Sequence, residues 1–174
     1  EYFISAPANL SVIHMKATGA QKLNFQAKME RWHFFGGTMR TNDNGVALWG
    51  QLADDGLAFY TKVTGTTKGG KLYAMGRSLV VEDADEVTLY YCAATSFWGE
   101  DPKAYVNKKL TDGLAKNYGE LKEEHIADYQ SYFNRVSLEL YSETEINNFA
   151  TNEAKHNSVA DIPTGELLAS VKNG

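Results

Sequence analysis

The chain has 174 residues, 43% hydrophobic and 22% charged, a balance that is sufficient for one globular core. Its 17 basic and 22 acidic residues give a formal net charge of -5 without a basic stripe, which argues against a nucleic-acid partner. No apolar run reaches the roughly 18 residues needed to span a bilayer, so no membrane partner is predicted.

Residues 1–95 show short apolar runs separated by turns, a pattern typical of an antiparallel sandwich or barrel. The turn segments "NDNG", "ADDG" and "KGG" contain Asn and Gly, which tolerate the positive φ of tight hairpins, so consecutive strands are predicted to pair. "EDADE" is another such connection. The predicted strands cover residues 2–5, 10–17, 23–30, 34–40, 46–52, 57–64, 71–75, 78–82 and 87–95.

The segment "DEVTLYYCAAT" is apolar on both faces, which predicts a central strand that is covered on each side. It contains Cys92, the only cysteine, so the chain forms no internal disulfide. We expect a buried structural thiol here, because a reactive thiolate would need electropositive surroundings.

Two helices are predicted to cover this strand, within residues 102 to about 133. Asp101 followed by Pro102 is a good helix start, because the carboxylate caps free amides and proline suits the first turn. The second helix, from about residue 120, has a broad apolar side.

The stretch "HIADYQSYFNRVSLEL" changes from helical spacing to strand spacing at Val136, Leu138 and Leu140. We interpret it as a structural joint that docks the helix against the sheet. A proton-transfer pair of His125 and Asp128, one helical turn apart, is the alternative. The predicted joint residues are His125, Asp128, Tyr129, Phe133 and Arg135.

These elements predict a mainly β fold. It is an antiparallel β-sandwich, supersandwich-like and incomplete, with two covering α-helices near its C-terminal end. The sandwich portion is expected to cover residues 1–141, and residues 142–174 to form a linker with a short helix at residues 164–172.

The sequence contains no pattern that indicates a metal or a cofactor. Its four histidines lack metal-ligand spacing, and "GTTKGGK" lacks the phosphate-loop motif. Paired carboxylates would suit glycoside hydrolysis, but the acidic clusters fall in predicted turns, where solvation is the simpler explanation. These clusters are Asp54 with Asp55, and Asp83 with Asp85 and Glu86.

Aromatic residues are the remaining candidates for function. Trp98 in "TSFWGEDP" and Trp32 in "MERWHFF" have faces that can stack on sugar rings, although core packing is the competing explanation. Trp98 falls in a predicted loop and is therefore the substrate-binding candidate.

The segments "YFISAPANLSVIHMKA", "DDGLAFYTKV", "LVVEDADEVTLYYCAATSF" and "HIADYQSYFNRVSLEL" occur in that order. In order and spacing they resemble the N-terminal β-sandwich domain of the α-L-fucosidases of glycoside hydrolase family 95. The chain departs from that pattern at "IPTGELL", where Gly165 and Leu167 replace an aspartate and an arginine.

The resemblance implies a parent enzyme with an N-terminal sandwich, a helical linker, a catalytic (α/α)6 barrel and a C-terminal β domain. Such enzymes remove terminal α-linked L-fucose with inversion, and their acid and base lie in the barrel, so no catalytic residue is expected in this chain. It also implies that the chain is a fragment of the sandwich and that the parent is secreted or periplasmic.

We therefore expect a noncatalytic portion of an α-L-fucosidase-like hydrolase, inactive alone. Its partner would be the (α/α)6 domain of the same parent chain, and the parent would act on a fucosylated glycan. A free-standing carbohydrate-binding module is the alternative. A protein-interaction domain, the third possibility, predicts an exposed apolar patch.

Overall fold

The computed structural model describes residues 1–31, 36–40 and 45–138 of the chain. The chain divides into two compact units, Glu1–Ser131 and Tyr132–Gly174. The predicted boundary after residue 141 stays a prediction, and the linker with its helix at residues 164–172 lies outside the described residues.

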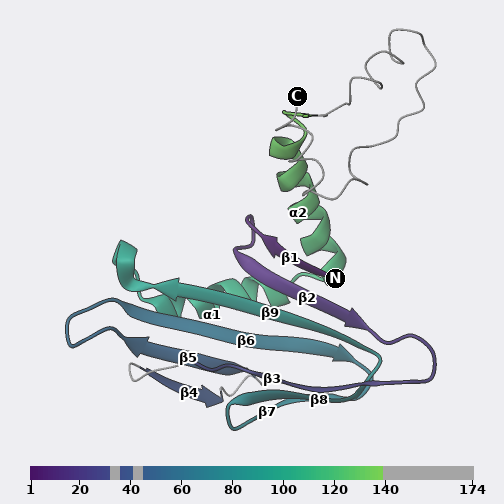
Figure 1. Cartoon of the computed structure of the whole chain (residues 1–174), viewed down its shortest axis with the longest axis horizontal. Coiled ribbons are helices and arrows are strands. Elements are labelled where there is room, and N and C mark those ends of the chain that lie inside the picture. The colour runs from purple at the N-terminus through teal and green to yellow at the C-terminus, as the bar shows by residue number, and fades with distance from the viewer. Residues whose placement is uncertain (32–35, 41–44, 139–174) are drawn as a thin grey trace, which may run out of the picture. The chain divides into compact units, whose positions relative to one another are not determined.

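The fold of the first unit is mainly antiparallel β, as predicted, with two sheets and two helices (Figure 1). The larger sheet has the strand order β1-β2-β9-β6-β5-β4, and the smaller has the order β3-β8-β7. The strands are β1 Tyr2–Ser5, β2 Leu10–Lys16, β3 Leu23–Lys28, β4 Gly36–Arg40, β5 Val46–Gln51, β6 Ala58–Lys68, β7 Lys71–Met75, β8 Ser78–Ala84 and β9 Glu86–Thr95.

Strand β9 is the centre of the larger sheet, between β2 and β6, which confirms the prediction from its two apolar faces. On one face, Tyr90 and Cys92 belong to the core beneath the helices. On the other face, Val87 and Leu89 belong to the core shared with the smaller sheet. The sequence is apolar on both sides of β9 because the strand separates two cores.

Helix α1, Pro102–Leu114, lies across β6 and β9 on the first of these faces (Figure 1). It begins as predicted, because the Asp101 carboxylate accepts a hydrogen bond from the Lys103 amide at 2.9 Å. Val106 and Leu110 are its main buried side chains. Helix α1 therefore covers the core on one of the two faces of β9.

Helix α2, Tyr118–Phe133, begins at a reciprocal capping box. The Glu120 amide donates to Asn117 Oδ1 at 3.0 Å, and the Asn117 amide donates to Glu120 Oε2 at 2.9 Å. Leu121, fully buried, joins α2 to the core beneath α1. The capping box therefore fixes where the second helix starts.

The prediction that consecutive strands pair is wrong at two of the turns it relied on. β6 and β7, joined through "KGG", lie in different sheets, and so do β8 and β9, joined at Asp85. The physical reason is that β6 and β9 pair with each other as far as Lys68 and Glu86, so each connection must cross to the other sheet. These turns close the sandwich.

The strand predicted from Val136, Leu138 and Leu140 is not found in the described part of that segment. Residues 136–138 have no regular secondary structure, and both Val136 and Leu138 are 81% exposed. Leu140 lies outside the described residues. Alternating side chains form a strand only where a neighbouring strand completes the hydrogen-bond ladder.

Candidate functional site

A cavity of about 600 Å³ lies where the ends of β6 and β9 meet the start of α1. A second cavity, of about 480 Å³, adjoins it beside β5 and shares Phe59, Tyr60 and Pro102 with it. We call the two together the aromatic groove. The first is lined by Asn9, Phe59, Tyr60, Thr61, Tyr91, Ala93, Ala94, Thr95, Trp98, Glu100, Pro102 and Tyr105. The second is lined by Trp49, Gly50, Gln51, Ala58, Phe59, Tyr60, Pro102 and Lys103.

Trp98, the predicted substrate-binding residue, lines the first cavity and is 85% exposed. It is the last residue of a single 3-10 turn, Ser96–Trp98. Thr95 caps the start of this turn, and Gly99, with φ of 81°, caps its end. Phe97 meets the Trp98 ring edge-on, with 4.8 Å between centroids. The short turn therefore holds a large apolar ring in water beside the cavity. Trp32 lies outside the described residues.

Polar side chains border the same groove. Asn9 Nδ2 donates a hydrogen bond to Tyr105 Oη at 2.5 Å, which links the end of the β1–β2 turn to α1. Glu100 is the carboxylate among the residues that line the first cavity, and Gln51 and Lys103 line the second. The Arg31 guanidinium lies 4.5 Å from the centroid of Phe59 and packs against that ring.

Cys92 lies in the strand beneath the groove and is buried, as the sequence predicts. Burial raises the pKa of its thiol. Its Sγ lies 3.5 Å from the carbonyl oxygen of Asn9. A thiol in this setting stays protonated at neutral pH and is not a ready nucleophile.

The acidic clusters lie in or beside turns, and Asp83 and Asp85 form structural contacts there. Asp85 pairs with Lys22, and the Asp83 amide donates to Asn24 Oδ1 at 3.0 Å. Asp54 and Asp55 are exposed in the connection between β5 and β6. None of these four carboxylates lines either cavity.

The predicted joint residues fall on both sides of the division between the two units. His125 stacks on Phe3 of β1, with 4.9 Å between centroids, and lies 6.2 Å from the Tyr129 ring. Asp128 accepts a hydrogen bond from Ser131 Oγ through its carbonyl oxygen at 2.7 Å. In the second unit, Arg135 lies over the Tyr132 ring at 4.7 Å, and Phe133 is exposed. The joint role of the five residues stays a prediction.

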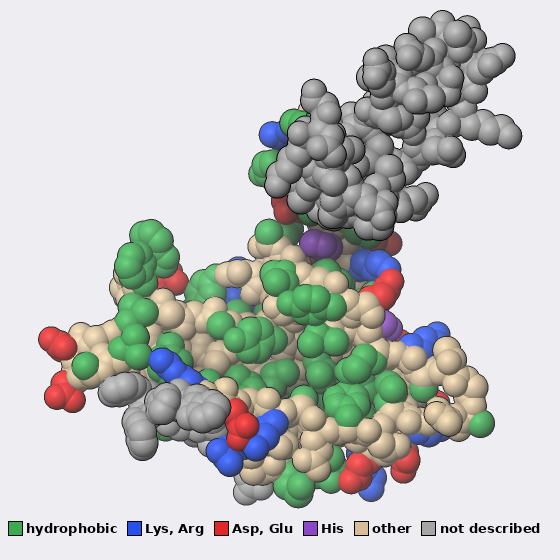
Figure 2. Space-filling model, viewed as in Figure 1, with side chains coloured by type: hydrophobic (Ala, Val, Ile, Leu, Met, Phe, Trp, Pro, Cys, Tyr) green, Lys and Arg blue, Asp and Glu red, His purple; other side chains and the backbone are tan. Residues whose placement is uncertain are grey.

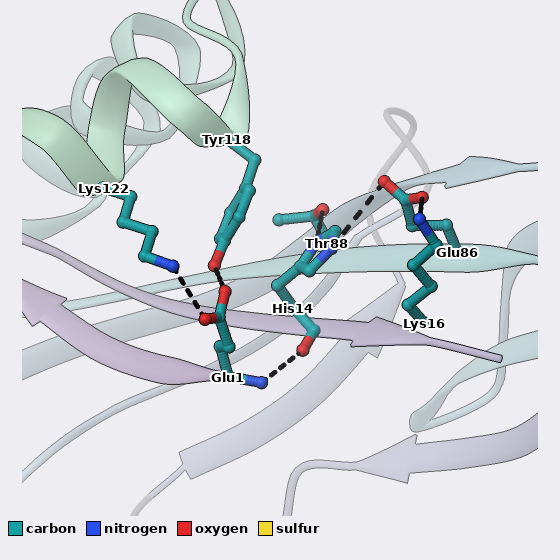
Figure 3. A network of polar contacts seen from close by, with 7 residues as sticks. All are labelled: Glu1, His14, Lys16, Glu86, Thr88, Tyr118 and Lys122. Atoms are coloured by element: carbon teal, nitrogen blue, oxygen red, sulfur yellow. Dashed lines mark hydrogen bonds and ion pairs between the residues drawn. The ribbon is translucent and has the colours of Figure 1, made fainter. Parts of the chain in front are cut away.

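A polar network that the sequence did not indicate connects α2 to the sheet (Figure 3). The Glu1 carboxylate accepts hydrogen bonds from Lys122 Nζ at 2.7 Å and from Tyr118 Oη. The bonds from Lys122 and then Tyr118 lower the pKa of Glu1 to about 2. Burial and the Glu1 carboxylate raise the pKa of Tyr118, and the bond to Glu1 raises the pKa of Lys122.

His14 extends this network along β2 (Figure 3). Its ring stacks on Tyr118, its Nδ1 lies 2.9 Å from Thr88 Oγ1, and its Nε2 lies 3.7 Å from Glu86 Oε1. Lys16 Nζ lies 3.9 Å from the other oxygen of Glu86. Because its members come from β2, β9, α2 and the residue before β1, the network docks the helix against the sheet. No sequence motif marks it, since its residues are up to 121 positions apart.

Two further searches concern the described residues alone. In residues 1–31, 36–40 and 45–138, no group of three or more His, Cys, Asp or Glu side chains is placed to hold a metal ion. Neither helix in that part of the chain combines the length and apolar character needed to cross a membrane.

Similarity to known proteins supports the expected class. Residues 1–100 match the family described as Glycosyl hydrolase family 65, N-terminal domain. A probable alpha-fucosidase A of Aspergillus niger is 30% identical over 145 residues, covering 73% of this chain and 17% of that protein. The chain thus spans about 17% of the length of this relative. The predicted glycoside hydrolase N-terminal domain with an α-fucosidase relative is confirmed, whereas the family number 95 is not. With more than half of its residues matched, the chain belongs to the glycosyl hydrolase family 65 N-terminal domain family.

Proposed function

We propose that this chain is the noncatalytic N-terminal domain of an α-L-fucosidase-like glycoside hydrolase. In this proposal the general acid and base belong to an (α/α)6 domain of the same polypeptide, which removes terminal α-L-fucosyl groups with inversion. The observation that carries the proposal is the family match, together with the α-fucosidase relative of which the chain spans 17%.

The distribution of carboxylates supports this division of roles. Glycoside hydrolysis in most families requires two carboxyl groups that flank the scissile bond, about 5–10 Å apart. The residues that line the aromatic groove include one carboxylate, Glu100. Among the other acidic residues, Asp85 and Glu86 form ion pairs with lysines. A single carboxylate does not make such a pair, so a second domain is the natural source of both catalytic carboxyl groups.

An apolar surface supports packing against such a domain. Tyr2, Ile4 and Tyr91 lie on the face of the larger sheet that is opposite α1, because Ile4 pairs with Ser11 and Ser11 pairs with Tyr91. Tyr2 is 61% exposed and Ile4 is 59% exposed. Figure 2 shows hydrophobic side chains gathered over the middle of this face. Apolar patches of this kind are typical of interaction surfaces.

The test compares the chain with the polypeptide encoded by its complete gene on a fluorogenic α-L-fucoside. We expect turnover by the complete polypeptide and none by the chain. NMR of the first product should show the β-anomer, as inversion requires. Turnover by the chain alone would refute the noncatalytic role, and an inactive complete polypeptide would refute the fucosidase assignment.

The same apolar face would also suit a protein-interaction domain without any hydrolase partner. Analytical ultracentrifugation separates the two cases. A domain that packs against a catalytic barrel in its own polypeptide leaves the complete polypeptide monomeric. Self-association of the complete polypeptide that Ile4→Asp abolishes would favour the interaction domain instead.

A further inference from the structure

The two cavities of the aromatic groove are neighbours, because Phe59, Tyr60 and Pro102 line both of them. The volumes of about 600 and 480 Å³ lie within the range of about 300–1,000 Å³ that is typical of small-molecule sites. Each cavity therefore has room for a small ring compound, and the shared wall makes them neighbouring subsites.

Each cavity has its own exposed tryptophan. Trp98 lines the first and is 85% exposed, and Trp49 lines the second and is 46% exposed. Tryptophan is usually largely buried, since its side chain has a large apolar area. Two of them left in water along one groove indicate a ligand with flat apolar faces.

The polar residues of the groove indicate which polar groups the ligand must carry. Asn9, Glu100 and Thr95 border the first cavity, and Gln51 and Lys103 border the second. These side chains offer both donors and acceptors of hydrogen bonds. A ligand that fits must combine an apolar face with hydroxyl groups around its edge, and a pyranose ring has this character.

We propose that the aromatic groove binds an oligosaccharide of neutral pyranose rings, with one ring stacked on Trp98 and another on Trp49. The groove lies within Glu1–Ser131, so binding requires no catalytic domain. The site therefore goes beyond the scaffold role: the chain itself holds part of a glycan while the chemistry takes place elsewhere in the enzyme.

Three properties of the groove favour this ligand over a peptide or a nucleotide. Its two tryptophans line separate neighbouring cavities, which suits two rings of one oligosaccharide. The lining residues include one carboxylate and one amine, and Arg31 at Phe59 adds a single further positive charge, which is less than the cluster of cations that suits a phosphate. The Asn9 to Tyr105 hydrogen bond and the packing of Arg31 on Phe59 keep the walls in place, which lowers the entropy cost of binding.

The experiment titrates the full chain of 174 residues with 2′-fucosyllactose, lactose and L-fucose, by calorimetry and by tryptophan fluorescence. We expect 1:1 binding and a blue shift in emission when a sugar ring covers Trp98. Trp98→Ala should weaken binding of 2′-fucosyllactose at least about tenfold, which corresponds to about 1.4 kcal/mol. Trp49→Ala should weaken the binding of 2′-fucosyllactose more than the binding of L-fucose. The trisaccharide reaches both tryptophans, whereas a single ring can occupy the Trp98 subsite alone.

Tyr2→Ala is the matched control, because Tyr2 is an exposed aromatic residue that lines neither cavity. It should bind 2′-fucosyllactose like the unaltered chain, and circular dichroism should show that all variants are folded. The proposal is overturned if none of the three sugars binds at up to about 10 mM. It is also overturned if Trp98→Ala and Tyr2→Ala bind alike. Either result leaves the fucosidase assay of the complete polypeptide unaffected, so the two proposals fail separately.

Discussion

The imidazole ring of His14 stacks on the phenol ring of Tyr118, with 4.0 Å between centroids and 17° between planes. His14 belongs to β2 and Tyr118 to the first turn of α2, so this contact joins the second strand of the larger sheet to the second helix. Tyr118 also donates a hydrogen bond to the Glu1 carboxylate. The docking of α2 against the sheet therefore depends on whether this carboxylate is ionised.

The Glu1 carboxylate is expected to make stability depend on pH. Its pKa is lowered from 4.5 to about 2 in the folded chain, so its contribution is fully present above pH 4.5. The contribution is lost as pH falls through about 2, where the folded carboxylate is protonated. Urea unfolding should therefore find the chain more stable than Glu1→Gln above pH 4.5, with the two converging near pH 2.

Glu123→Gln removes an exposed carboxylate from the same helix and is the control for this experiment. Its stability should follow that of the unaltered chain across the pH range. A constant difference between the unaltered chain and Glu1→Gln at every pH would contradict the assigned role of the carboxylate.

Leu121→Ala should destabilise the chain by about 2–5 kcal/mol, since the fully buried side chain fills the core between α2 and the sheet. Urea unfolding monitored by circular dichroism measures the loss. Ile126→Ala, at a 39% exposed position on the same helix, should change stability by about 0.5 kcal/mol. Equal losses would show that α2 does not pack through Leu121.

Gly70→Ala and Gly76→Ala separate backbone strain from a steric clash. Both glycines have positive φ, of +61° and +60°, so alanine costs about 1–2 kcal/mol at either. A Cβ on Gly70 would also lie 2.1 Å from the carbonyl oxygen of Glu82, whereas one on Gly76 meets nothing within 4 Å. Thermal unfolding should find Gly70→Ala the less stable by a further 1–3 kcal/mol, approximately. Similar melting temperatures for the two variants would argue against the close approach of Gly70 to the carbonyl oxygen of Glu82.

Cys92 should react slowly with Ellman's reagent in the folded chain, because it is buried and its thiol pKa is raised. In urea the reaction should be fast and complete, with one thiol per chain. The ratio of the two rates measures how strongly the core beneath α1 protects the Cys92 thiol from the reagent. Rapid reaction without denaturant would mean that the strand beneath the groove is open to solvent.

Several features of this protein are encoded locally. The two-sided apolar pattern of "DEVTLYYCAAT" predicts a central strand, because each face must meet a core. Asp101 and Pro102 predict the start of α1, because capping and a fixed φ act within a few residues. Trp98 is predicted to lie in a loop because it falls between the central strand and the helix start at Asp101 and Pro102, with Gly99 directly after it.

Other features depend on partners that no local pattern names. The alternation at Val136 and Leu138 does not produce a strand, because no neighbouring strand pairs with those residues in the described part of the chain. The turns at Gly70 and Asp85 cross between the sheets, because β6 pairs with β9 and not with β7, and β9 pairs with β6 and not with β8.

The amino-acid sequence by itself determined the strand-rich class, the central strand, the helix start and the likeness to a fucosidase N-terminal domain. Tertiary structure alone decided which strands share a sheet, how Glu1 meets Lys122, and that Trp49 and Trp98 line one groove. The reason is one of range: periodicity, capping and turn propensity act over a few residues. Pairing between strands and the assembly of a groove depend on contacts between positions far apart in the chain.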